Sequence, residues 1–174
     1  MRGRLFLASA ATATTLTGAA DASEIEVIVE IREHLIAEYH KPYVAIWVAH
    51  PDHTVAANLA LWYQQGKGPK GEPGEKWLKD IRRWWRKEGN KVSAAGVTGP
   101  TKPAGRYRVQ FNDVDGPLKD LPHGDYVLHV EAAREKGERE LIRIPFEWTD
   151  KGAASLAVKG EVELGYVTVT VTPW

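Results

Sequence analysis

Apolar and polar residues alternate along most of the chain after residue 22, and this period of two is the pattern of β-strands with one buried face. Over residues 24–32 and 105–112, aliphatic or aromatic side chains occupy every second position. Residues 43–49 and 55–63 form two more such runs, and the short turn sequence between them predicts a β-hairpin. Because no strand–helix–strand rhythm interrupts these runs, the sequence predicts an all-β fold.

The last run, residues 161–173, changes phase. Its apolar positions include Val162 and Leu164 in one phase and Val167 in the other, and the change falls beside Gly165. A slip at a glycine predicts a β-bulge, which we expect to change the sheet that the strand serves. Many short antiparallel strands predict an immunoglobulin-like β-sandwich, here without the cysteine pair of antibody domains.

One segment, residues 74–89, has helical rather than strand spacing. Its sequence, GEKWLKDIRRWWRKEG, predicts one inserted tryptophan-rich helix that ends at Gly89. Adjacent Trp84 and Trp85 would point about 100° apart, so we expect one of them to be partly exposed. Two interpretations remain open: Trp77, Trp84 and Trp85 cover the end of the sandwich, or they form a wall on which a flat aromatic ligand stacks.

The first 22 residues have the pattern of a secretory signal peptide. Arg2 and Arg4 precede an uncharged, small and apolar stretch that ends in Ala20-Asp21-Ala22. We expect cleavage after Ala22, which leaves one domain at residues 23–174 and no apolar run long enough to span a bilayer. A cytosolic tail is the alternative interpretation.

Composition excludes several functions. The chain has no cysteine, which excludes thiol catalysis and thiolate metal sites. Lysine and arginine number 23 and aspartate and glutamate 23, so the sequence does not predict a nucleic-acid partner or a polybasic membrane anchor. Nucleophile elbows, phosphate-binding loops and paired catalytic carboxylates are absent from the sequence, so no self-contained catalytic constellation is predicted.

The histidines suggest little chemistry. His50 and His53 flank a turn and could share a metal ion, but no third ligand stands nearby in the sequence, and solvated turn residues are the more common case. His129 is expected on the polar surface of a strand.

Several segments together resemble a family of predicted periplasmic proteins of unknown function: KPYVAIWV, LALWYQ, WLKDIRRWWR, GVTGPTKPAGRYRVQF and LPHGDYVLHVEAAREKGERELIRIPF. The resemblance covers about residues 24–172. It implies a sandwich similar to the immunoglobulin-like domain of flagellar hook-scaffold proteins. It also implies a genetic association with PepSY-type membrane reductases, TonB-dependent receptors and flavin transferases, and hence a role in extracytosolic redox chemistry such as iron acquisition.

The loop after the helix resembles the acceptor motif of FAD:protein FMN transferases, Asp-x-x-Ser/Thr-Gly-Ala-Thr, in which the last threonine receives FMN. In this chain Thr98, Gly99 and Thr101 match the motif, whereas Ala95 and Pro100 depart from it. Pro100 stiffens the backbone and removes an N–H just before the acceptor. A plain connecting loop is the alternative interpretation.

Two functional hypotheses follow. In the first, FMN is covalently attached to Thr101, Trp77, Trp84 or Trp85 stacks on its ring, and Arg83 with its neighbours Arg82 and Arg86 stabilises its negative charge. In the second, the protein is a non-redox binding or scaffolding module whose tryptophan-rich helix docks on a membrane reductase or receptor.

Overall fold

The computed structural model describes residues 22–68, 71–89 and 98–173, which form nine strands in two sheets. The four-stranded sheet has the order β5 (Gly105–Asn112), β1 (Glu24–Ile31), β9 (Leu164–Thr172), β8 (Ala154–Lys159). The five-stranded sheet has the order β4 (Thr98–Gly99), β3 (Val55–Trp62), β2 (Tyr43–Ala49), β6 (Gly124–Ala133), β7 (Arg139–Trp148). All pairs are antiparallel except β3–β4.

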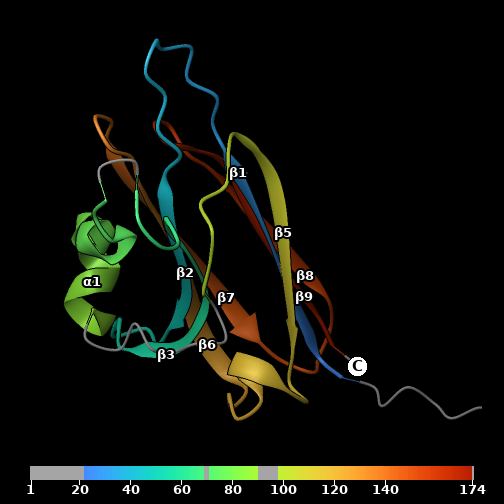
Figure 1. Cartoon of the computed structure of the whole chain (residues 1–174). Helices are drawn as coiled ribbons and strands as arrows, with labels where there is room; N and C mark the ends of the chain where they lie inside the picture. Colours follow the sequence, from blue (N-terminus) through green and yellow to red (C-terminus); the bar gives the residue numbers. More distant parts are fainter. Residues whose placement is uncertain (1–21, 69–70, 90–97, 174) are drawn as a thin grey trace, which may run out of the picture.

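The two sheets face each other, and their inner faces share one apolar core (Figure 1). Val27 and Val29 of β1 are fully buried there, as are Ile46 of β2 and Leu128 of β6. The alternating burial of β1 follows its sequence pattern residue by residue. The predicted β-sandwich and its hairpins are therefore confirmed.

The predicted bulge is present in β9. Val29 of β1 pairs with Val167, but Ile31 pairs with Leu164, so β9 carries one extra residue next to Gly165. This extra residue lets Leu164 and Val167 both point into the core. The expected change of sheet was wrong, because β9 pairs with β1 and β8 of the same sheet throughout its length.

The tryptophan-rich segment forms two short helices instead of one. A 3-10 helix, η1 (Gly74–Asp80), is followed by α1 (Arg82–Glu88), and the chain bends between them at Ile81. They lie on the outer face of the five-stranded sheet and not over the end of the sandwich (Figure 1). A further 3-10 turn, η2, spans Gly116–Leu118.

In the part of the chain that the structure describes, no helix combines the length and the hydrophobicity needed to cross a bilayer. Residues 1–21 of the predicted signal peptide lie outside the described residues.

Candidate functional site

A second apolar cluster holds the two helices against the sheet. Trp47 of β2 and Leu61 of β3 meet Leu78, Ile81 and Trp84, and each of these side chains is at most 3% exposed. Burial of one side chain of this size contributes about 1.5–3 kcal/mol. The two helices are therefore held rigidly against the sheet, and their exposed side can form one wall of a binding site.

A buried carboxylate caps the start of α1. Glu131 of β6 is fully buried and accepts hydrogen bonds from the backbone N–H groups of Arg83 (3.0 Å) and Trp84 (2.9 Å). It also accepts one from Arg139 Nη1 at 2.7 Å. A carboxylate satisfies the free N–H groups at a helix start and complements the helix dipole. Glu131 thus joins α1, β6 and β7 at one point.

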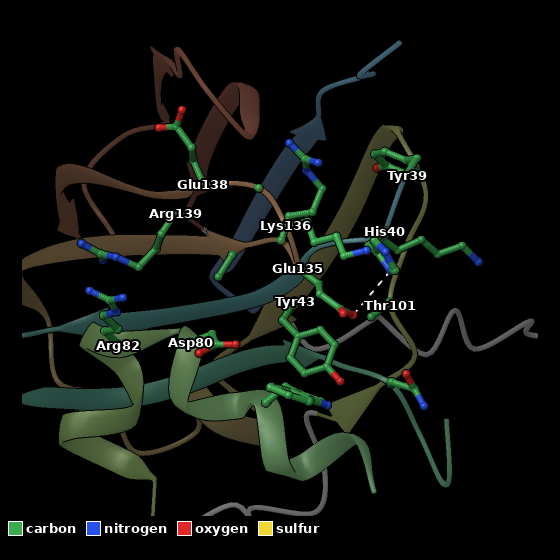
Figure 2. Close-up of a pocket in the computed structure, with 16 residues that line it drawn as sticks. Tyr39, His40, Tyr43, Asp80, Arg82, Thr101, Glu135, Lys136, Glu138 and Arg139 are labelled. Atoms are coloured by element: carbon green, nitrogen blue, oxygen red, sulfur yellow. Dashed lines mark ion pairs between the residues drawn. The ribbon is translucent and has the colours of Figure 1, made fainter. Parts of the chain in front are cut away.

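A cleft of about 680 Å³ opens where β2 begins, between the helical segment and the β6–β7 turn (Figure 2). Its lining includes three aromatic side chains, Tyr39, Tyr43 and Trp77. Its polar lining includes cationic and acidic side chains, among them Lys41, Arg82, Lys136, Arg139, Asp80 and Glu135. Tyr43 is fixed in place, because its hydroxyl donates to the Gly74 carbonyl at 3.0 Å.

A chain of ion pairs runs along one rim of the cleft. Lys136 Nζ lies 2.7 Å from Glu38, and His40 is 3.3 Å from Glu38 and 3.5 Å from Glu135. The hydrogen bonds from Lys136 and His40 lower the pKa of Glu38, and Glu38 raises the pKa of Lys136. Exposed pairs of this kind add little stability. Their effect is to place the His40 ring at the cleft.

A buried ion pair supports the β6–β7 turn from behind. Arg134 Nε donates to Glu163 at 2.9 Å, and these side chains are only 7% and 1% exposed. The second oxygen of Glu163 accepts from the Glu138 backbone N–H at 2.9 Å. Separating the two partners would leave a buried charge without compensation, which is strongly destabilising. The ion pair therefore holds the turn in one position.

Thr101 belongs to the same cleft. It is partly buried, and Figure 2 shows it at the end where His40 and Glu135 pair. The chain just before it is anchored, because the Gly99 carbonyl accepts from the Tyr63 N–H (3.0 Å) and from Gln65 Nε2 (3.2 Å). Thr101 therefore follows a fixed strand, not a free loop.

Residues 24–166 match the family described as "Predicted periplasmic protein (DUF2271)". The chain belongs to this family. No match was found among curated proteins or among solved structures. The family description confirms the periplasmic localisation that the N-terminal sequence predicts.

Two of the predicted site residues of this DUF2271 protein, Thr101 and Trp77, line the cleft together. Thr98 and Gly99 form β4, where they pair with Leu61 and Trp62 of β3. Ala95, at the start of the motif, lies outside the described residues.

The remaining predicted residues lie on α1. Trp84 is 3% exposed and its Nε1–H donates to Asn58 Oδ1 at 2.9 Å, which fits the interpretation of a structural cover. Trp85 is 36% exposed, so the expectation that one of the two is partly exposed is confirmed. Arg83 is not part of the cleft lining, whereas its neighbour Arg82 is.

The prediction for His129 was wrong. In the DUF2271 protein its side chain is 1% exposed, with the Trp47 ring stacked 4.8 Å away and the His53 ring at 5.6 Å. Burial lowers the pKa of His129 to about 4, and Arg143, His53 and Arg83 add to this effect. Among the described residues, no three metal-ligating side chains come together, so His50 and His53 gain no third ligand.

Most of the cleft residues were not found from the sequence. Tyr43 and His40 lie near the start of β2, and Glu135 and Lys136 lie in the β6–β7 turn. These segments meet because β2 pairs with β6 so that Tyr43 stands opposite Ala133. Finding these residues would have required the antiparallel pairing of two strands some 90 residues apart in the sequence. Alternation within each strand does not reveal which strands pair.

Proposed function

We propose that this protein is a periplasmic flavin carrier in which FMN is joined to Thr101 through a phosphoester. The observation that best supports this is the position of Thr101 in the wall of a cleft that also presents Trp77 and Tyr43. The cleft volume of about 680 Å³ falls within the range of roughly 300–1,000 Å³ typical of small-molecule sites.

The residues of the cleft fit an FMN group. Trp77 and Tyr43 offer aromatic surfaces to a flat ring system. Lys41, Lys136 and Arg82 offer positive charge for a phosphate and for a reduced, anionic ring. Arg82 lines the cleft and Arg83 does not, so Arg82 replaces Arg83 as the proposed partner of the negative charge, and Trp84 is buried in packing contacts.

Attachment would require an FAD:protein FMN transferase. The Thr101 hydroxyl oxygen forms a bond to the FMN phosphorus of FAD, the P–O bond of the pyrophosphate breaks, AMP leaves with the bonding electron pair, and the hydroxyl proton is released. When bound, FMN supplies one- and two-electron transfer. Trp77 and Tyr43 would hold the group, and Lys41, Lys136 and Arg82 would place positive charge beside it.

The partner proposed for electron exchange is a PepSY-type membrane reductase, in an extracytosolic chain related to iron acquisition. The periplasmic family supports the compartment, and the resemblance of the sequence supports the partner.

Co-expression with an active FMN transferase in a secreting host tests the proposal. We expect a mass increase of one FMN less one water, and in-gel fluorescence that survives denaturation. Thr101→Ala should remove both signals and Thr101→Ser should keep them, and Thr172→Ala at an exposed position of β9 is the matched control that should also keep them. A fluorescent Thr101→Ala protein, or a dark wild-type protein beside a labelled control substrate, would refute it.

A non-redox docking module is the second candidate function, and the exposed Trp85 favours it. If the wild-type protein stays unmodified, a photo-crosslinking residue in place of Trp85 should form a discrete adduct with a membrane reductase or receptor. The absence of such an adduct would count against this candidate.

A further inference from the structure

The exposed side of α1 is basic although the whole chain carries no net charge, whereas in η1 the cations Lys76 and Lys79 stand beside the exposed acids Glu75 and Asp80. In α1 the cations are Arg82, Arg83, Arg86 and Lys87. The single acid of this helix, Glu88, is 8% exposed and accepts from Asn58 Nδ2 at 3.1 Å. It therefore adds no negative charge to the exposed side of the helix.

Two tryptophans are exposed among these cations. Trp77 is 37% exposed, and Lys76 Nζ and Lys79 Nζ lie 5.0 and 5.8 Å from the centroid of its ring. Trp85 is 36% exposed and is the sequence neighbour of Arg86, whose Nε donates to the Arg82 carbonyl at 3.1 Å. We call the exposed basic and tryptophan side chains of η1 and α1 the basic face, although Lys76 Nζ is paired with Glu72 at 2.7 Å. The basic face is defined by Lys76, Trp77, Lys79, Arg82, Trp85, Arg86 and Lys87.

We infer that the basic face docks on a membrane surface that contains anionic phospholipids. Indole rings favour the headgroup region of a bilayer, and lysine and arginine beside them attract anionic headgroups. The apolar side of the helices is already buried against the five-stranded sheet. The exposed indoles and the cations of α1 are left for the lipid, and Glu75 and Asp80 of η1 are exposed beside them, so the contact is peripheral and reversible.

The uneven distribution of charge would orient the protein on the membrane. Because the chain has no net charge, the excess of cations on the basic face is matched by an excess of acids elsewhere. A charged surface therefore orients the molecule as well as attracting it. Trp77 and Arg82 also line the cleft, so the docked protein holds its cleft opening close to the membrane. This inference does not depend on a modified Thr101.

Co-sedimentation with vesicles tests the inference. We expect the periplasmic protein to bind vesicles of phosphatidylethanolamine with phosphatidylglycerol, and not vesicles of phosphatidylcholine alone, with a blue shift of tryptophan emission and release at high salt. Arg86→Glu with Lys87→Glu should weaken the partition about tenfold or more. Trp85→Ala should reduce both binding and the blue shift.

Matched controls lie on other surfaces. Arg106→Glu with Lys119→Glu changes the total charge by the same amount at exposed positions, and Tyr166→Ala removes a 50% exposed aromatic ring from β9. These variants should bind vesicles as the wild type does. Equal losses in the control and basic-face variants would overturn the inference, as would wild-type binding that does not depend on anionic lipid.

Discussion

The imidazole of His129 stacks on the indole of Trp47, with 4.8 Å between the ring centroids and an angle of 25° between the planes. Both side chains are 1% exposed, and neither nitrogen of His129 has a hydrogen-bond partner among the described residues. The ring is thus held as a neutral aromatic group beneath the helical layer. Protonation there would bury a charge next to Arg83 and Arg143.

We predict that His129 makes the fold sensitive to acid. Its folded pKa of about 4 lies below the ordinary value of 6.5, so the unfolded chain binds the proton more tightly. The free energy of unfolding should therefore fall as the pH drops from about 6.5 to about 4, by about 3 kcal/mol from this residue. Denaturant unfolding across this range measures the loss. His129→Phe should flatten the profile, and an unchanged profile would contradict the prediction; exposed His123→Ala is the control.

We predict that Glu131→Ala destabilises the protein by about 3–5 kcal/mol, because it leaves the Arg83 and Trp84 N–H groups and the Arg139 guanidinium without their buried acceptor. Glu131→Gln should cost less, since one oxygen remains to accept. Chemical denaturation followed by tryptophan fluorescence gives both values. Glu147→Ala on the exposed side of β7 should stay within about 0.5 kcal/mol; a similar loss there would mean that burial is not the cause.

We predict that Gly74→Ala loosens the helical wall of the cleft. A Cβ atom at this position would collide with the Gln64 backbone carbonyl, and the Gly74 carbonyl accepts the Tyr43 hydroxyl. The cost should be about 1–3 kcal/mol, with faster hydrogen exchange in η1. At Gly99 an added Cβ would meet only an ordinary contact, 3.6 Å from Trp62, so Gly99→Ala is the control. Equal protection of η1 in wild type and Gly74→Ala would refute this.

We predict that Thr101→Ala changes the free energy of unfolding by no more than about 0.5 kcal/mol, because a partly exposed hydroxyl contributes little. Thermal unfolding of the two proteins measures the difference. A loss of several kcal/mol would show that the hydroxyl is structural and out of reach of a transferase.

We predict that Pro100→Ala with Ala95→Asp raises the flavinylated fraction on co-expression. The alanine frees the backbone and restores an N–H beside Thr101, and an aspartate side chain can accept a hydrogen bond from the backbone two residues further along and so order the segment. Adding Thr101→Ala should abolish the signal. If the restored motif stays dark with an active transferase, the motif match is coincidental.

Alternation within a strand predicted much of the sandwich, because residues such as Val27 and Val29 face the core by period alone. It failed at His129, which lies on the outer face of β6. That face is covered by the helical layer and the His53 turn, and the pattern of one strand does not say what covers its second face.

The helical segment and the cleft also show what local sequence patterns do not predict. The spacing of Trp84 and Trp85 predicted one buried and one exposed ring, but the break at Ile81 was not visible in it. Thr101 was found through a motif and Trp77 through its chemistry. His40 and Glu135 meet at the cleft only through the pairing of β2 with β6, which is a long-range property of the fold.

The anchoring of β4 to β3 has a mechanical consequence for Thr101. Gly99 is fixed by the Tyr63 N–H and by Gln65, and Gly105 starts β5 at the edge of the other sheet. The intervening residues bridge the two sheets, and Thr101 is only two residues from the Gly99 anchor. Two residues span at most about 7 Å. A group attached to Thr101 would therefore stay close to the Gly99 anchor, and a partner of that group would have to approach this edge of the sandwich.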